Sequence, residues 1–324
     1  LLESYRNLLR KTLADAALSP KDIELIMCTA QIDQGLYFSI NRKFRQGEKP
    51  FPQFCYDNHL ADALPRCFFS PSDHLYEHQE KAIHSILAGN ATVISSGTGS
   101  GKTEAFLIPI VDHCLKNRGR GVKALIIYPT NALANDQLDR LVKALRDTEI
   151  SFGVFVGPTP EDCSKEKVDP NCPGHRVYRQ DMRTDPPDIL ITNYVMLDRM
   201  LTRPKDLAMF QKSKDTLQYI VLDEIHSYRG NKAAHLTYLL ARLKFNLDPA
   251  VIQIATSATL QRKTGVGAYM DASDDEVGEF IKPLLGVENY NLVKPNYQTT
   301  PPPSQPSAIP EDLYKQQENL DWDM

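Results

Sequence analysis

The sequence lacks long apolar runs, a secretory signal and an excess of positive charge. No stretch of about eighteen uncharged apolar residues occurs, so we expect no membrane-spanning helix. Residues 1–18 are amphipathic and charged throughout, without the apolar core and cleavage site of a signal peptide. The formal net charge of −4 argues against a protein that coats nucleic acid with bulk positive charge. It still permits one that holds a strand with a few amides and hydroxyls.

Cysteines are also scarce. Six among 324 residues are too few for a disulfide scaffold, which favours a cytoplasmic protein in a reducing environment. Cys163, Cys172 and His175 do lie close together in the sequence. Their spacing matches no common zinc pattern and lacks a clear fourth ligand, so an ordinary polar loop is the simpler interpretation.

Composition divides the chain into three predicted parts. Residues 1–70 open with a helical segment and continue into a mixed, aromatic-containing stretch, which we interpret as an N-terminal accessory element. Residues 71–297 alternate strand-like and helix-like segments and are expected to form the main domain. Residues 298–324 are rich in proline and then acidic, as is typical of a linker or tail.

The main domain contains short runs that are apolar at successive positions, with amphipathic segments between them. Residues 123–129 are such a run, whereas apolar residues recur at helical spacing between residues 138 and 145. Continuous apolar strands separated by helices indicate a parallel sheet that is covered on both sides. The expected fold class is α/β, a doubly wound parallel sheet with helices on both faces. The predicted strands are residues 91–95, 123–129, 151–157, 188–193, 219–224 and 251–258.

A glycine-rich stretch, "SGTGSGKT", follows the first of these strands and precedes a helix-forming sequence. In that context backbone N–H groups can surround the β-phosphate of a nucleotide, although a flexible turn is the alternative. Lys102 is expected to reach the β- and γ-phosphates, and the Thr103 hydroxyl to bind Mg²⁺. The first glycine of the usual pattern is replaced by Ser96, which is small enough to fit. The predicted nucleotide-binding residues of this loop are Ser96, Gly97, Thr98, Gly99, Ser100, Gly101, Lys102 and Thr103.

A second apolar strand ends in "DEIH", residues 223–226. Carboxylates that follow a strand lie at the same edge of a parallel sheet as a phosphate loop that follows another strand. We expect Asp223 to hold Mg²⁺ and Glu224 to orient and deprotonate the attacking water, with Lys102 as the third catalytic residue. The alternative is a solvated acidic pair with no role in chemistry.

Six segments in order resemble the motifs of superfamily-two helicases of the DEAD/DEAH type. They are "YEHQ", "SGTGSGKT", "YPTNALANDQ", "TNYVMLDRML", "DEIH" and "TSATL", which together span about residues 70–297. The resemblance implies a RecA-like first motor domain that uses ATP and Mg²⁺ and binds a single nucleic-acid strand, DNA more than RNA. The sequences of these motifs most resemble those of bacterial mitomycin-repair-type helicases and of large helicases in phage-defence (DISARM-like) operons. A role in defence or repair is the corresponding expectation.

The resemblance also assigns roles to residues outside the two nucleotide motifs. Gln79 would contact the adenine base, with Tyr76 as a weaker candidate for stacking. Ser257 and Thr259 would link hydrolysis to the nucleic-acid side through His226, or form ordinary strand-end hydrogen bonds. Four residues at strand-to-helix junctions would hold the phosphates of the strand, or cap helices, or do both. They are Thr130, Asn131, Thr192 and Asn193.

Two absences bear on activity. No Q-x-x-G-R-x-G-R-like segment, the arginine-bearing motif of a second motor domain, occurs in the sequence. An arginine that reaches the transition state accelerates nucleotide hydrolysis by about 10³–10⁵ in enzymes where it has been measured. We therefore expect slow hydrolysis by these 324 residues alone. We also expect a second RecA-like domain in a longer chain, which the missing initial Met supports. Protein partners in a multi-subunit system are a further expectation.

Three other functions are alternatives to a DNA helicase. An RNA helicase is the nearest alternative, because DEIH also occurs among RNA-directed relatives. A scaffold subunit with a purely structural nucleotide site is the non-enzymatic alternative. A GTPase or kinase is disfavoured for two reasons. The segment "GNKAAH" has no Asp two residues beyond its Lys to recognise guanine, and neither class contains a motif that corresponds to "TSATL".

Overall fold

The computed structural model describes residues 10–14, 19–29, 43–68, 72–97, 99–162, 172–245, 251–258, 261–263, 269–271 and 274–298. Its contacts divide the chain into two units, residues 1–42 and 43–324. The first unit contains helix α2 (Pro20–Thr29), which Ser19 precedes with a side chain that accepts a hydrogen bond from the Asp22 N–H at 3.2 Å. The second unit carries the sheet and all of the motifs.

Eight strands of the described residues form one sheet, in which every pair is parallel. The α/β prediction is confirmed, and each of the six predicted strands is present. In spatial order the strands are β12 (Asn291–Val293), β3 (Thr92–Ser95), β9 (Ile252–Ser257), β8 (Tyr219–Leu222), β4 (Ala124–Tyr128), β7 (Ile189–Asn193), β5 (Phe152–Phe155) and β6 (His175–Arg176).

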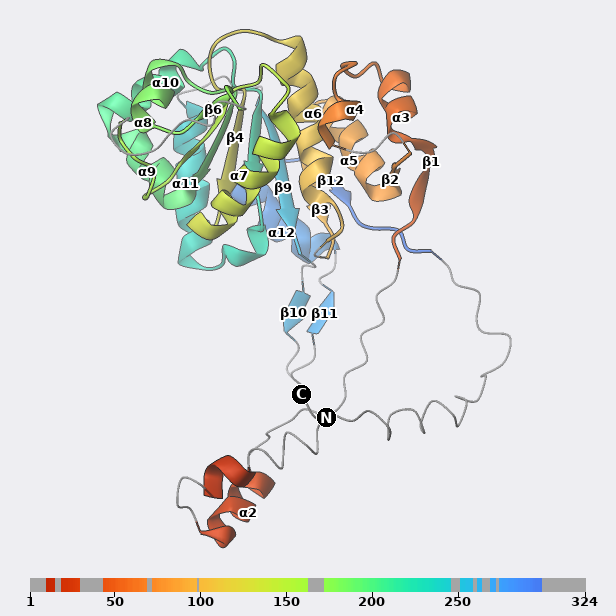
Figure 1. Ribbon diagram of the computed structural model, residues 1–324, viewed down its shortest axis with the longest axis vertical. Helices are drawn as coiled ribbons and strands as arrows, with labels where there is room; N and C mark the ends of the chain where they lie inside the picture. Colours follow the sequence, from red (N-terminus) through yellow and green to blue (C-terminus); the bar gives the residue numbers. More distant parts are fainter. Residues whose placement is uncertain are drawn as a thin grey trace. The chain divides into compact units, whose positions relative to one another are not determined.

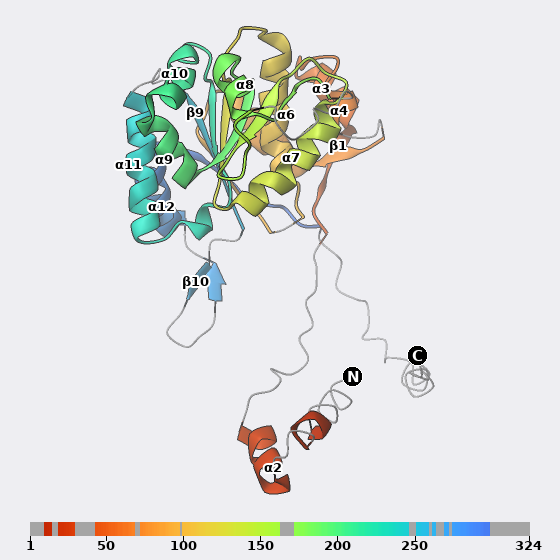
Figure 2. The same ribbon diagram turned by 60° about the vertical axis from the view of Figure 1, so that its left-hand side comes forward.

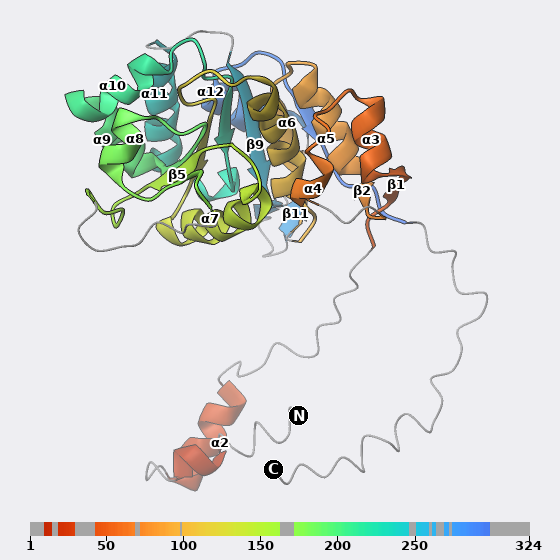
Figure 3. The same ribbon diagram turned by 45° about the horizontal axis from the view of Figure 1, so that its top comes forward.

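Helices cover both faces of the sheet, as Figures 1 and 3 show. Side chains alternate along each strand: Ile126 of β4 belongs to one buried cluster, while Leu125 and Ile127 belong to the other. This alternation explains why the strands are apolar at successive positions. One face packs against α5 (Glu77–Leu87), α6 (Lys102–Lys116) and α7 (Asn131–Leu145). The other packs against α8 (Arg179–Thr184), α9 (Tyr194–Thr202), α10 (Pro204–Lys212), α11 (Asn231–Phe245) and α12 (Asp274–Leu285).

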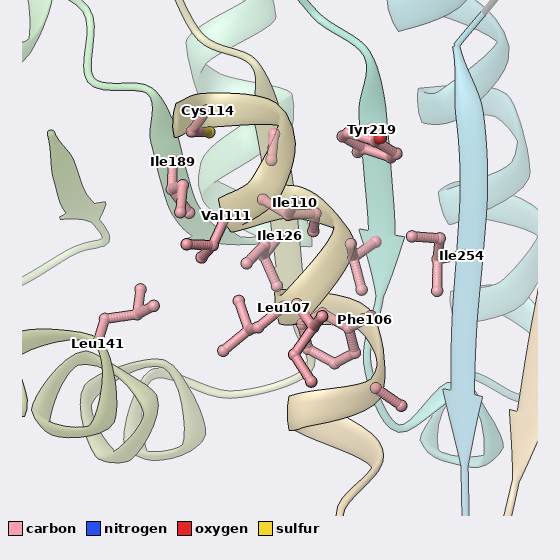
Figure 4. Close-up of a cluster of buried hydrophobic side chains, with 14 of the residues drawn as sticks. Phe106, Leu107, Ile110, Val111, Cys114, Ile126, Leu141, Ile189, Tyr219 and Ile254 are labelled. Carbon is pink, nitrogen blue, oxygen red and sulfur yellow. The ribbon is translucent and has the colours of Figure 1, made fainter. Parts of the chain in front are cut away.

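Helix α6 forms the centre of the first cluster. Figure 4 shows Phe106 and Ile110 of this helix on the side of the sheet that carries Ile126 of β4 and Ile254 of β9, and all four are fully or almost fully buried. Burial of each such side chain stabilises the fold by about 1.5–3 kcal/mol. Because α6 begins at Lys102, this packing also fixes the end of the glycine-rich loop.

Residues 43–68 belong to the main domain rather than to a separate accessory element. They form β1 (Gln46–Pro50), α3 (Phe51–Asp57) and α4 (Pro65–Phe68), and β1 pairs with β2 (His74–Tyr76). Phe51 and Leu64 are fully buried in the same cluster as α6. The Ala61 N–H donates to Asp112 Oδ1 of α6 at 2.7 Å. The division at residues 42 and 43 thus replaces the expected boundary at residue 70, because these side chains cover the outer sides of α5 and α6.

The two ends of the described part of this unit lie side by side (Figure 1). Phe44 and Tyr297 form an antiparallel β-bridge. The Arg45 N–H donates to the Asn296 carbonyl, and the Gln298 N–H to the Lys43 carbonyl, each at 2.9 Å. A separate hairpin of β10 (Gln261–Lys263) and β11 (Tyr269–Asp271) follows β9 and is visible in Figure 2.

The sequence also raised the questions of a membrane-spanning helix, a metal site and the state of the cysteines. No helix among the described residues has both the length and the apolar composition to cross a membrane. Nor does that part of the chain contain three or more His, Cys, Asp or Glu side chains grouped as metal ligands. Cys163 and the proposed tail beyond residue 298 lie outside the described residues, while the His175 ring stacks on Phe152 with centroids 5.3 Å apart. Cys55, Cys67 and Cys114 are buried thiols.

Candidate active site

The predicted motifs occupy one edge of the sheet. Because the strands are parallel, their carboxyl ends share that edge. The glycine-rich loop follows β3, Ser257 ends β9 and Asp223 follows β8, and these three strands are neighbours. The next two strands, β4 and β7, lead into Thr130 and Asn193. The candidate hydrolysis residues and the candidate nucleic-acid residues therefore lie on adjacent halves of the same edge.

The glycine-rich loop is held by its own hydroxyl groups. Ser100 Oγ donates to the Gly97 carbonyl at 2.9 Å and lies 2.5 Å from Ser96 Oγ, which must therefore donate to it. Gly99 and Gly101 have φ of +72° and +75°, in the left-handed region that favours glycine. Ser96 thus replaces the usual glycine with a hydroxyl that closes the loop. Thr98 lies outside the described residues.

The Lys102 ammonium group lies within this loop. Nζ donates to the carbonyls of Ser96 and Gly97 at 2.7 and 3.0 Å, and the residue is only 8% exposed. Burial lowers the pKa of Lys102, and the negative charges of Glu224 and Asp223 partly offset that shift. The lysine and both carboxylates are therefore within electrostatic reach of one another, while Thr103 occupies the first turn of α6.

Asp223 is buried, with 6% of its surface exposed. Burial raises the pKa of this carboxyl group, and a hydrogen bond from the Thr256 hydroxyl opposes the shift. The same Thr256 oxygen accepts the N–H of Glu224 at 3.2 Å. Thr256, at the end of β9, therefore holds both acidic residues.

Glu224 has a strained backbone, with φ of +51°, which is rare for a residue with a side chain. Its Oε2 accepts the Ala258 N–H at 3.3 Å. His226 Nδ1 lies 3.0 Å from the same oxygen but is not oriented as a hydrogen-bond donor toward it, so this is a close polar contact only. The glutamate is thereby turned toward the end of β9.

The residues expected to recognise adenine make contacts within the protein. Gln79 Oε1 accepts the Tyr76 N–H at 2.8 Å, and Nε2 donates to the Gly101 carbonyl at 3.0 Å. The Tyr76 ring is stacked on His78, with centroids 5.6 Å apart. One amide hydrogen of Gln79 has no acceptor among the described residues, so base recognition stays a prediction.

Of the expected link through His226, the contact from Ser257 is not formed among the described residues. The Ser257 hydroxyl is buried and has no hydrogen-bond partner among the described residues, while His226 contacts Glu224 instead. The Ser257 carbonyl accepts the Ser96 N–H at 3.1 Å, which joins β9 to the glycine-rich loop. Thr259 lies outside the part of the chain that the structure describes.

The second half of the edge contains a surface cavity of about 370 Å³. Thr130 caps α7 by accepting the Leu133 N–H at 3.4 Å, and Asn193 caps α9 by accepting the Met196 N–H at 2.7 Å. The capping role predicted for these two residues is confirmed, and it does not prevent contact with a ligand. The cavity is lined by Pro129, Thr130, Asn131, Gly157, Asn193, Tyr194, Val195, Met196 and Arg199.

Thr192 is the residue for which the structure contradicts the prediction. Its side chain is fully buried, and Oγ1 donates to the Phe155 carbonyl at 2.7 Å. A hydroxyl in that position cannot reach a phosphate at the surface. The neighbouring Asn193 can, and its Nδ2 donates to Asn131 Oδ1 at 2.5 Å.

Three side chains escaped the sequence analysis. Thr256 holds the acidic pair, His78 contacts the glycine-rich loop through Nε2 and the Ser100 carbonyl at 2.8 Å, and Arg199 lines the cavity. All three lie inside the motifs named in the sequence analysis. Their roles depend on which segments are neighbours in space, and no local pattern indicates that.

The sequence was compared with models of known protein families. Residues 76–265 match the model of the DEAD/DEAH box helicase. The chain belongs to this family. The match covers more than half of the chain and includes the glycine-rich loop, the acidic pair and the residues around the cavity, so the family prediction is confirmed.

Individual relatives agree with this assignment. Druantia protein DruE of Escherichia coli is 29% identical over 274 residues, which cover 53% of this chain and 15% of that protein. The structure of the Mycobacterium smegmatis helicase Lhr bound to ssDNA and AMP-PNP is 28% identical, with a TM-score of 0.52, and the match covers 69% of this chain and 26% of Lhr. The helicase MrfA bound to DNA has a TM-score of 0.55 at 24% identity, with coverage of 78% and 29%, which shows a shared fold. The chain thus spans less than a third of each of these proteins.

Proposed function

We propose that the chain is the first motor domain of an ATP-dependent helicase or translocase that acts on DNA. The observation that carries the proposal is the position of Lys102, Asp223 and Glu224 at one edge of the sheet, after β3 and β8, where the negative charges of both carboxylates act on the lysine. A buried cation beside two carboxylates, at the start of a helix, has the chemistry to bind a triphosphate and its metal.

The residues present fit a magnesium–nucleotide complex. Gly99 and Gly101 adopt the left-handed conformations that a phosphate loop needs, and the Lys102 ammonium already lies among loop carbonyls that a phosphate oxygen could replace. Thr103 and Asp223 would supply hydroxyl and carboxylate oxygens, the ligands that Mg²⁺ prefers. The bound ion would neutralise charge on the β- and γ-phosphates.

Glu224 is the proposed general base. Its carboxylate is held by the Ala258 N–H, and Thr256 fixes its backbone beside Asp223. A carboxylate held in this way can orient a water molecule and accept its proton. Asp223, which is kept buried and hydrogen-bonded, is suited to bind the metal rather than to exchange protons.

Replacing Thr256 with valine is expected to slow ATP hydrolysis by about 10- to 100-fold and to lower the free energy of unfolding by about 1–3 kcal/mol, because a buried carboxylate loses its donor. Burial raises the pKa of Asp223 because it destabilises the ionised carboxylate. Loss of the Thr256 hydrogen bond destabilises that ionised form further. The loss should therefore be smaller at acid pH and grow as pH rises through that pKa. Urea unfolding at several pH values measures it, with Thr256→Ser, which keeps the hydroxyl, as the control.

DNA is the proposed nucleic acid. Lhr, which is 28% identical, is bound to ssDNA in its structure. In this chain, the cavity beside Thr130 and Asn193 is lined by neutral hydroxyls, amides and one arginine. Such groups suit contacts to a phosphate backbone without selection of bases. A second motor domain in a longer chain, protein partners, a role in defence or repair, and a cytoplasmic location, which the buried thiols favour, are parts of the same proposal.

Binding of a strand can be tested with two adjacent residues. Asn193→Ala is expected to weaken binding of fluorescent single-stranded DNA by roughly 3- to 10-fold, because one hydrogen-bonding group is lost. Thr192→Val should leave the affinity unchanged while it lowers stability, since Thr192 is buried. Fluorescence anisotropy with DNA and with RNA of the same sequence distinguishes the substrates. Tighter binding of RNA would favour the RNA-helicase alternative, and no binding of either would favour a scaffold.

A further inference from the structure

Two consecutive side chains of α5 contact two consecutive carbonyls of the glycine-rich loop. His78 Nε2 lies 2.8 Å from the Ser100 carbonyl oxygen, and Gln79 Nε2 donates to the Gly101 carbonyl oxygen at 3.0 Å. Both side chains are almost completely buried. The first turn of α5 therefore touches the loop at the two peptide groups that immediately precede Lys102.

The hydrogen bond of His78 defines its tautomer. A carbonyl oxygen can only accept, so Nε2 must carry the hydrogen. Nδ1 is buried and has no hydrogen-bond partner among the described residues. Burial lowers the pKa of His78; the hydrogen bond to the Ser100 carbonyl opposes this shift, and the positive charges of Lys102 and Lys81 add to it. The side chain is therefore a neutral imidazole that donates from Nε2.

The ring is held in place by aromatic neighbours. It stacks on Tyr76 at 5.6 Å between centroids and packs against Phe44 at 5.2 Å. On the loop side, a side chain at Gly101 would meet Gln79 Nε2 at 2.1 Å, so the two segments are in close contact. The donor thus has a defined position relative to the loop, as a positioning group requires.

Peptide geometry converts these contacts into an effect on the nucleotide site. In a trans peptide the carbonyl oxygen and the following N–H point in opposite directions. A donor that holds the Ser100 carbonyl therefore aims the Gly101 N–H away from α5. Gln79 does the same for the Lys102 N–H through the Gly101 carbonyl. These are N–H groups of the kind that a phosphate loop presents to its anion.

We propose that His78 is a positioning residue of the ATP site, whose Nε2–H holds the Ser100 peptide so that the next N–H faces the phosphates. The proposal rests on the proposed function, since it assumes that this loop binds the phosphates of ATP. It assigns His78 no contact with the nucleotide. Its effect should therefore depend on the phosphates and not on the base.

The test compares variants that differ in the reach of one donor. A glutamine amide can place its nitrogen where Nε2 lies, whereas the asparagine amide is one methylene shorter. We expect His78→Phe and His78→Asn to weaken binding of non-hydrolysable ATP and GTP analogues alike, by roughly tenfold, and His78→Gln to stay within about threefold of the parent protein. Lys116→Ala, which removes a donor at the far end of α6 and makes no contact with the loop, should also stay near the parent value.

Calorimetric titrations of the full chain, with melting temperatures for each variant, separate the outcomes. Unchanged affinity in folded His78→Asn, or equal losses in His78→Asn and His78→Gln, overturns the proposal. So does a loss confined to the adenine analogue. Should the parent chain bind neither analogue, the proposed function fails. If the parent binds, Lys102→Ala does not, and the His78 variants match the parent, only the positioning role fails.

Discussion

Replacing Lys102 with alanine is expected to weaken binding of a non-hydrolysable ATP analogue by at least about 100-fold. The ammonium group lies among the loop carbonyls of Ser96 and Gly97, where it would contact the β- and γ-phosphates. Each charge-assisted hydrogen bond contributes about 1.5–3 kcal/mol, and two such bonds would be lost. Isothermal titration in the presence of Mg²⁺ measures the change directly.

The chain offers a matched control on the same helix. Lys116, at the other end of α6, donates to the His59 carbonyl and pairs with Asp112, far from the loop. Lys116→Ala should bind the analogue like the parent protein. Equal affinity of Lys102→Ala and the parent would refute the assignment of the loop as a nucleotide site. The melting temperature shows whether any loss reflects unfolding.

Replacing Glu224 with glutamine is expected to slow ATP hydrolysis by about 10²–10⁴, the usual contribution of a general base. Glutamine has nearly the same shape and keeps an oxygen that can accept the Ala258 N–H, so binding of the ATP analogue should change by less than about threefold. A single-turnover assay with protein in excess over labelled ATP measures the rate even where the parent reaction is slow.

The matching control removes a carboxylate elsewhere. Glu149 forms an exposed ion pair with Arg118, shortly before the amino end of β5. Glu149→Gln should hydrolyse ATP at the parent rate, because exposed pairs contribute little. Hydrolysis at the parent rate by Glu224→Gln would contradict the proposed base. Loss of hydrolysis with intact biological function would instead favour the scaffold alternative.

Regular elements were predictable where the pattern is local. Helix α7 contains residues 138–145, which were predicted from helical spacing because i, i+3 and i+4 positions report on one face of one helix, and α6 is the helix expected after the glycine-rich loop. The short strands β6 and β12 were not predicted. With two and three residues they carry no periodicity, and β12 forms because Asn291–Val293 pairs with Thr92–Ile94, about two hundred residues earlier.

Burial was less predictable than secondary structure. Thr130 and Thr192 both stand near strand ends and have the same side chain. Thr130 is exposed as the cap of α7, whereas Thr192 is enclosed beneath Phe155 and Met200. The aromatic residues of 43–68 could likewise belong to a separate element or to the main core. Only packing against α5 and α6 distinguishes these cases.

By itself, the amino-acid sequence determined that a glycine-rich loop precedes a helix and that an acidic pair ends a strand. These features depend on contiguous residues, such as Gly99 and Gly101 with positive φ followed by Lys102 at the helix start. The tertiary structure decided that β9 lies between β3 and β8, and therefore that Thr256 holds the acidic pair. It also decided that α5 packs beside α6, so that His78 reaches the loop. Hydrogen bonds between residues distant in the chain depend on the order of strands and helices in space, which no local pattern encodes.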